Sequence, residues 1–165
     1  MSRRSAIGLA ACAGLGLLPL AATTAAAPAG TSSYMNIAGV AFRAGSHATV
    51  LVSHPGNCIA TGNAPIHADF FLPQGAVLQG VRAYGHNDGI DPGAGVQIAI
   101  NAYDGAGQSL MLLDGVTRWP QGYASEPFPI TPGVVIDNQT HAYSLLARVP
   151  DGQQLCSVRI LYVAP

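Results

Sequence analysis

The chain has 165 residues, of which 49% are hydrophobic and only 9% charged, and its formal net charge is −1 at pH 7. This length fits one domain, and so apolar a composition excludes an intrinsically disordered chain. All seven basic residues are arginine, and a weakly acidic chain without lysine lacks the basic face that nucleic-acid binding requires.

Residues 1–29 have the order of a secretory signal peptide. Arg3 and Arg4 supply a positive start, Ala6–Leu20 is an uncharged apolar run, and an Ala-rich stretch of small residues follows it. The apolar run is shorter than the roughly 20 residues that a membrane-spanning helix needs. We therefore expect a removed signal rather than a membrane anchor.

Processing of this signal would leave one domain at residues 30–165, secreted or periplasmic, with no transmembrane segment. Cleavage is expected after Ala26 or Ala29, and export could follow the general or the twin-arginine route. Leu9–Cys12 also resembles a bacterial lipidation motif, so a lipid anchor at Cys12 is the alternative. Without Arg3 and Arg4 the domain has five arginines against eight acidic residues, a net charge of −3.

Two cysteines, Cys58 and Cys156, remain after processing. In an exported protein such a pair predicts one disulfide, here closing a loop of 98 residues. Neither cysteine has the clustered Cys or His neighbours that a zinc site needs. We expect Cα atoms about 4.4–6.8 Å apart, with Cys156 on the apolar face of its strand.

Beyond the signal, short β-branched and aromatic runs alternate with Gly, Pro, Asn and Asp, which is typical of an all-β chain. No stretch shows the helical spacing of apolar residues. The predicted strands are Ile37–Arg43, Ala48–Ser53, Ile66–Phe71, Ala76–Gly85, Val96–Tyr103, Ser109–Leu113, Val134–Asp137, Ala142–Val149 and Leu155–Val163.

The last two predicted strands alternate most clearly, with apolar residues on one face and polar residues such as Ser157 and Arg159 on the other. The turn residues Pro150–Gln153 between them predict an antiparallel hairpin. A second hairpin is predicted at Asp104–Gly107. Trp119–Gly133 contains four prolines and is predicted to be a long irregular loop.

These elements predict an all-β domain, a single antiparallel two-sheet sandwich of jelly-roll or immunoglobulin-like topology, with a barrel as the alternative. Three segments, Leu72–Ala76, Asp137–Asn138 with Tyr143–Leu145, and Val158–Tyr162, resemble a loose group of small secreted bacterial β-sandwich proteins of unassigned function. The resemblance spans about residues 65–163. It implies the fold and export, and no catalytic residue or ligand.

Catalytic signatures are absent from the sequence: it has no nucleophile elbow, no zinc-protease motif and no phosphate-binding loop. No catalytic residue and no cofactor are expected. Asp88 and Asp91, with Asn87, are weak candidates for Ca²⁺ ligands, and the alternative is a solvated turn. The five histidines are scattered, and their convergence on a metal is the remaining enzymatic possibility. They are His47, His54, His67, His86 and His141.

Trp119, Tyr123 and Phe128 lie in the proline-rich segment. Exposed aromatic rings there would form a stacking surface for sugar rings or a protein partner, and Trp119 and Tyr123 are the candidate ligand-binding residues. The alternative is that they fold back over one end of the sandwich.

The sequence thus favours a secreted or envelope-associated, non-catalytic module with a structural or binding role. The first alternative is a carbohydrate-binding sandwich, and the second is a small extracellular enzyme with a His/Asp metal site.

Overall fold

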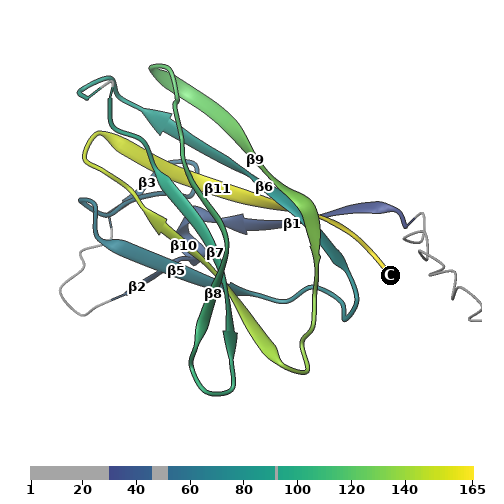
Figure 1. The fold of residues 1–165 in the computed structure, drawn as a ribbon. Coiled ribbons are helices and arrows are strands. Elements are labelled where there is room, and N and C mark those ends of the chain that lie inside the picture. Colours follow the sequence, from purple (N-terminus) through teal and green to yellow (C-terminus); the bar gives the residue numbers. More distant parts are fainter. Residues whose placement is uncertain (1–29, 46–51, 92) are drawn as a thin grey trace, which may run out of the picture.

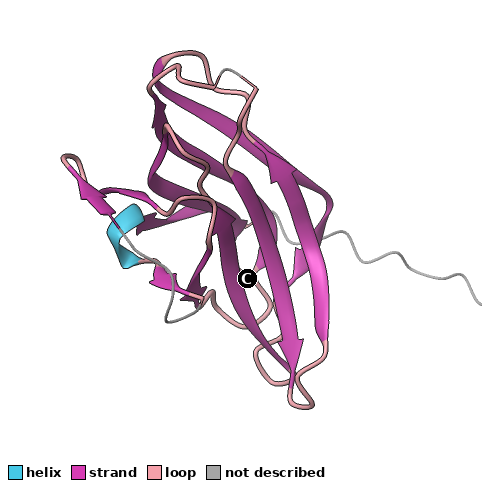
Figure 2. Ribbon diagram, turned by 90° about the vertical axis from the view of Figure 1, so that its left-hand side faces the viewer, coloured by secondary structure: helices cyan, strands magenta, loops and turns pink. Residues whose placement is uncertain are grey.

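The structure, a computed structural model, describes residues 30–45, 52–91 and 93–165 (Figure 1). The expected signal peptide at 1–29, the lipidation alternative at Cys12 and the histidine His47 lie outside these residues. In the part of the chain that is described, no helix is long and apolar enough to cross a membrane. Within the described residues, a 3-10 helix, η1 (Gly39–Ala41), interrupts what is otherwise strand and loop (Figure 2).

The strands form two antiparallel sheets, which we call sheet A and sheet B. Sheet A has the order β3 (Val52–His54), β4 (Cys58–Ala60), β11 (Gln153–Val163), β6 (Val77–Asn87) and β9 (Gly122–Val135), and β1 (Ser32–Ala38) also pairs with β11. Sheet B has the order β2 (Arg43–Ala44), β5 (Pro65–Phe70), β10 (His141–Arg148), β7 (Gln97–Asp104) and β8 (Ser109–Val116).

The predicted fold class, an antiparallel two-sheet sandwich, is confirmed. The inner faces of the two sheets share one core, to which β10 contributes Leu145 and Ala147 and β11 contributes Val158 and Ile160. These residues alternate with more exposed ones along each strand, because successive side chains of a strand point to opposite faces. Burial of apolar side chains between the sheets is the main stabilising contribution.

The predicted hairpin between the last two strands is wrong. The turn itself exists, since the N–H of Gln153 donates to the carbonyl of Pro150 at 3.1 Å. However, β10 pairs with β5 and β7 in sheet B, whereas β11 pairs with β6, β1 and β4 in sheet A. The turn therefore passes from one sheet to the other, and the two apolar faces meet across the core. The C-terminal strand does lie inside a sheet, as expected.

The second predicted hairpin is confirmed, because β7 and β8 are antiparallel neighbours. Asp104 organises the turn through its side chain, which accepts hydrogen bonds from the N–H groups of Ala106 at 2.9 Å and Gln108 at 2.8 Å. Gly107 supplies a positive φ of 79°, which costs glycine little.

The proline-rich segment is not the irregular loop that we expected, since most of it forms the 14-residue strand β9. Among the described strands β9 pairs only with β6, so it is an edge strand of sheet A. On an edge, alternate backbone nitrogens face away from the sheet, and prolines such as Pro127 and Pro129 cost no ladder hydrogen bond there. The same prolines hinder pairing with a further strand.

Most other strand boundaries shift by a few residues, but Val134–Asp137 is not a separate strand and overlaps the end of β9. Most of the predicted strand Ala48–Ser53 lies outside the described residues. The predicted strand Ile37–Arg43 is replaced by the end of β1, the 3-10 helix and β2.

The predicted disulfide is confirmed: Cys58 on β4 is bonded to Cys156 on β11, and the two Cα atoms are 3.7 Å apart, closer than we expected. The two strands also pair at Ile59 and Leu155. Cys58 is 1% exposed, but Cys156 is only half-buried. A bulge between Leu155 and Ser157 breaks the alternation, so the expectation that Cys156 shares the buried apolar face is wrong.

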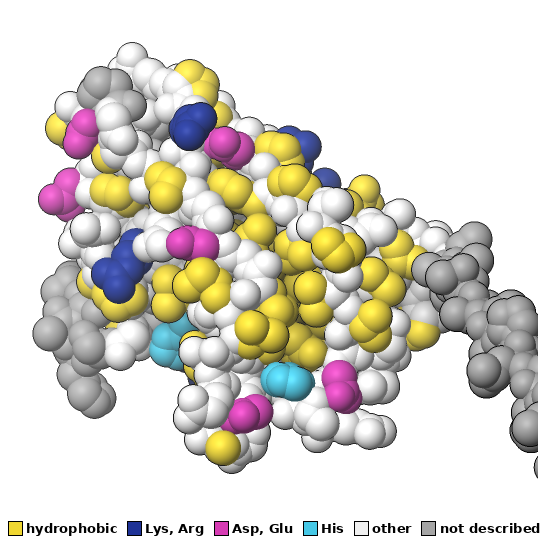
Figure 3. All heavy atoms as spheres, viewed as in Figure 1, with side chains coloured by type: hydrophobic (Ala, Val, Ile, Leu, Met, Phe, Trp, Pro, Cys, Tyr) yellow, Lys and Arg dark blue, Asp and Glu magenta, His cyan; other side chains and the backbone are white. Residues whose placement is uncertain are grey.

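On one side of the sandwich the edge strands β8 and β9, which belong to different sheets, lie next to each other. Figure 3 shows hydrophobic side chains gathered on the face of the molecule seen in Figure 1. A hollow of about 180 Å³ there is lined by apolar residues that include Leu110, Leu112, Val134 and Val135. Leu110 and Val135 are exposed.

Candidate functional site

The outer face of sheet A, the face turned away from the core, carries aromatic, cationic and amide side chains from four adjacent strands. Its members are Tyr34 and Asn36 on β1, Arg159 and Leu161 on β11, Gln79, Arg82, Tyr84 and His86 on β6, and Tyr123, Ser125, Pro127 and Pro129 on β9. All but Gln79 occupy this face because they alternate with buried residues such as Ala83 and Val158. Gln79 lies at the irregularity in register between Leu78 and Gly80.

Strand register sorts these side chains into rows across the sheet. One row pairs Asn36 with Arg159, Arg159 with Arg82, and Arg82 with Pro127. The neighbouring row pairs Tyr34 with Leu161, Leu161 with Gly80, and Gly80 with Pro129. The first row is polar and cationic, and the second is apolar and aromatic.

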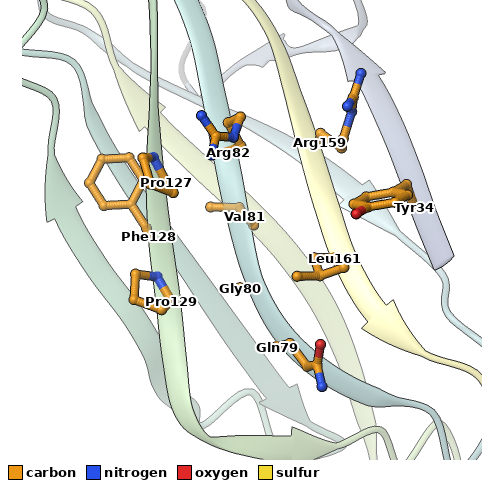
Figure 4. Close-up of a pocket in the computed structure, with 10 residues that line it drawn as sticks. All are labelled: Tyr34, Gln79, Gly80, Val81, Arg82, Pro127, Phe128, Pro129, Arg159 and Leu161. Atoms are coloured by element: carbon orange, nitrogen blue, oxygen red, sulfur yellow. The ribbon is translucent and has the colours of Figure 1, made fainter. Parts of the chain in front are cut away.

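A groove of about 230 Å³ follows these two rows (Figure 4). Leu161 and Gly80 lie in its middle, Arg82 and Arg159 lie toward one side, and Gln79 lies toward the other. Gly80 has a φ of +148°, and a Cβ at this position would overlap the carbonyl oxygen of Phe128. Only glycine fits there, which keeps the middle of the groove open.

Arg159 lies between two tyrosines. Its guanidinium carbon is 5.6 Å from the ring centroid of Tyr34 and 5.3 Å from that of Tyr84. Its Nε donates a hydrogen bond to Oδ1 of Asn36 at 3.0 Å. These cation–π contacts and the hydrogen bond fix the guanidinium and both rings relative to one another. Tyr34 nevertheless remains 59% exposed.

Two further pairs continue this face toward the open edge of the sheet. Nη1 of Arg82 donates to the hydroxyl oxygen of Ser125 at 3.2 Å. The rings of His86 and Tyr123 meet edge to face, with centroids 4.7 Å apart. Tyr123, one of the two aromatic residues singled out from the sequence, is 74% exposed and therefore belongs to this face.

Trp119, the other aromatic candidate, lies in the core and is 5% exposed. Its ring packs on Gly85, where any Cβ would overlap it. It therefore presents no ring face to a ligand, which agrees with the alternative that it folds back over the sandwich rather than with a stacking role. Phe128 is partly buried and packs against the core, with its ring directed away from the groove (Figure 4).

Asp88 and Asp91, the weak candidates for calcium, act as turn residues. Oδ1 of Asp88 accepts a hydrogen bond from the N–H of Ile90 at 3.0 Å, and Oδ1 of Asp91 accepts one from the N–H of Gly93 at 2.9 Å. Within residues 30–45, 52–91 and 93–165, no group of three or more His, Cys, Asp or Glu side chains could hold a metal. His67, His86 and His141 lie on three different strands.

A wider hollow of about 620 Å³ lies at the end of the sandwich beside this loop. Its amide side chains are used within the protein: Asn87 Nδ2 donates to the carbonyl of Trp119 at 2.9 Å, and Gln121 Nε2 donates to that of Asp88 at 3.2 Å. The outer face of sheet A instead combines exposed aromatic rings with arginine side chains beside a groove, so we regard that face as the candidate site.

Sequence reasoning missed most of this site. Tyr34, Tyr84, Arg82 and Arg159 come from three strands that are far apart in the chain. The available signal was the period-two alternation, which does place Arg159 opposite the apolar residues of its strand. Alternation indicates the face of a side chain, but not its neighbours on other strands.

No protein-family model matches the chain, and no curated protein matches it. Among solved structures it is similar to a family 29 carbohydrate-binding module, with a TM-score of 0.50 and 8% identity over 79% of this chain and 89% of that one. It is also similar to the C-terminal family 6 module of LamC, a marine laminarinase from Zobellia galactanivorans, with a TM-score of 0.48, 12% identity, and 78% and 98% of the two chains covered. At such low identity, the likeness to the family 29 module establishes the β-sandwich fold alone.

Proposed function

We propose that this protein is a secreted, non-catalytic module that binds carbohydrate on the outer face of sheet A. The observation that carries the proposal is the placement of Arg159 between Tyr34 and Tyr84 beside an open groove. A sugar ring offers an apolar C–H face and a rim of hydroxyl groups. Fixed aromatic rings beside forked hydrogen-bond donors are complementary to both.

The fold favours this function, the first alternative from the sequence, over the less specific structural or binding role that was its first interpretation. The family 29 module, whose sandwich is similar, is a carbohydrate-binding module. Fold alone does not carry function, so the proposal depends on the groove and its side chains.

Secretion is supported by two independent features. Residues 1–29 have the composition of a signal peptide, and the Cys58–Cys156 disulfide is typical of an oxidising compartment. N-terminal sequencing of exported protein should begin between residues 27 and 30. A start at Met1, or a lipidated start at Cys12, would contradict the proposed processing.

A glycan array probed with the protein tests the binding function, followed by titration of the retained glycans. Tyr34→Ala and Tyr84→Ala should each weaken binding. Tyr103→Ala is the matched control, because Tyr103 is a partly exposed tyrosine on β7 in the other sheet. Binding that is unchanged in both site variants, or equally reduced in the control, would place the ligand elsewhere.

A further inference from the structure

The two arginines of the candidate site form a cationic pair on an acidic protein. Arg82 and Arg159 are both exposed, and they face each other directly across the β6–β11 ladder. Like charges directly opposite each other in a sheet are destabilising. A domain with more acidic than basic residues could neutralise such a pair with a neighbouring carboxylate. The positions of its acidic residues therefore show whether Arg82 and Arg159 are neutralised within the protein.

All eight acidic residues lie in the described part of the chain, and none is within ion-pair distance of Arg82 or Arg159. Glu126 is the only one on a strand of sheet A, and it is paired with the buried Ala83, so it follows the inner face. Its carboxylate accepts a hydrogen bond from the backbone N–H of Arg118. The other acids lie in sheet B or in loops, at Asp69, Asp88, Asp91, Asp104, Asp114, Asp137 and Asp151.

The guanidinium groups also retain unused donors. Arg159 uses Nε for Asn36, and Arg82 uses Nη1 for Ser125. Among the described residues, no protein acceptor is found for either Nη of Arg159 or for Nη2 of Arg82. A guanidinium fork with free N–H groups matches the paired oxygens of a carboxylate or a sulfate.

From this charge arrangement we infer that the glycan bound on the outer face of sheet A is anionic, carrying carboxylate or sulfate groups that pair with Arg82 and Arg159. This inference rests on the proposed carbohydrate-binding function. A sugar chain lying along the apolar row would contact Tyr34 and Pro129, and its acidic substituents would lie over the neighbouring cationic row. Four strands give this site a width of about 14 Å, from a strand spacing of about 4.8 Å.

The test compares charged and neutral forms of the same polymers, using the full chain and a metal chelator in the buffer. One pair is polygalacturonate and its methyl-esterified form, and the other is dextran sulfate and dextran. Calorimetry or affinity electrophoresis should show that the charged member of at least one pair binds about tenfold more tightly or better, because hydrogen bonds to charged groups are the stronger ones. If the charged polymer is preferred in the first pair alone, the ligand carries carboxylate groups. If it is preferred in the second pair alone, the ligand carries sulfate groups.

Arg82→Gln should remove this preference, and so should Arg159→Gln. Arg159→Lys should retain part of it, because lysine keeps the charge but loses the fork. Arg148→Gln, which removes an exposed arginine from sheet B, is the matched control and should change nothing.

Three outcomes would overturn the inference. Equal binding of charged and neutral polymers, with Tyr34→Ala still weakening both, would leave carbohydrate binding intact and reject an anionic ligand. A loss in Arg148→Gln as large as that in Arg82→Gln would show non-specific attraction. If no polymer binds and the glycan array is also blank, the proposed function fails, and this inference fails with it.

Discussion

Gln74 and Asp137, which are 63 residues apart in the chain, are joined by a hydrogen bond from Nε2 of Gln74 to Oδ1 of Asp137 at 3.2 Å. The N–H of Asn138 donates in return to Oε1 of Gln74 at 2.7 Å, and Nδ2 of Asn138 donates to the carbonyl of Leu72 at 2.9 Å. These bonds fasten the loop before β6 to the loop before β10. They connect two of the segments that carry the resemblance to small secreted sandwich proteins.

Asp137 in this loop should make the stability of the fold depend on pH. Hydrogen bonds from the Thr140 hydroxyl, the Gln139 N–H and the Gln74 amide hold the pKa of Asp137 below its usual value. A carboxyl whose pKa is lower in the folded state stabilises the fold above its unfolded-state pKa, and this contribution is lost as the pH falls through the folded-state pKa. Thr140→Val should therefore raise the pKa of Asp137 and reduce this acid-side loss. An NMR titration of the Asp137 carboxyl in both proteins measures this rise, and the same pKa in the variant and the native chain would contradict the prediction.

Loss of the disulfide should lower stability without changing the fold. Replacing both Cys58 and Cys156 by serine removes a link across 98 residues. It should lower the free energy of unfolding by about 2–4 kcal/mol. Denaturant melts with and without reductant measure this: reductant should destabilise the native chain and leave the double variant unaffected. Two free thiols in the unreduced, unfolded native chain would be incompatible with the bond.

A methyl group added at Gly85, which packs against Trp119, should destabilise the fold. Gly85→Ala would place a Cβ against the indole ring and the carbonyl of Gln154. Overpacking of this kind costs about 1–3 kcal/mol, and Trp119 fluorescence reports any displacement of the ring. Gly105→Ala is the control, because a Cβ there meets nothing within 4 Å. Equal melts for the two variants would mean that both the indole ring and the Gln154 carbonyl move aside without cost.

Removal of Ile160–Pro165 should unfold the domain. This segment includes part of β11, which lies between β6 and β1, and the fully buried Ile160. Ile160→Ala alone should cost about 2–5 kcal/mol, against a usual total of about 5–15 kcal/mol for a domain. Leu110→Ala, at an exposed position, should change stability little. A truncated chain that melts cooperatively near the full-length temperature would show that this segment is peripheral.

The fold class could be predicted because alternation and turn residues are local properties. Asp104–Gly107 and Pro150–Gln153 have similar turn chemistry, yet only the first connects neighbouring strands of one sheet. A tight turn reverses the chain in both cases, and side-chain packing across the core decides which sheet receives the next strand. Edge position likewise decided whether the prolines of β9 were compatible with a strand.

The candidate site was harder to predict, because register assembles it. Tyr34 is paired with Leu161, and Arg82 with Arg159, which are pairings between residues distant in the chain. Local composition drew attention to both Tyr123 and Trp119, but it does not distinguish an exposed ring, as in Tyr123, from a buried one, as in Trp119.

The turn that carries the chain from β10 to β11 also constrains when the domain can form. β11 is the last strand in the described order, and β1, β4 and β6 all pair with it. During synthesis from the N-terminus, these three strands emerge before their common partner exists. Sheet A can therefore be completed only after β11 has emerged: until then β6 can pair with β9 and β3 with β4, but β1 has no partner strand among the described residues.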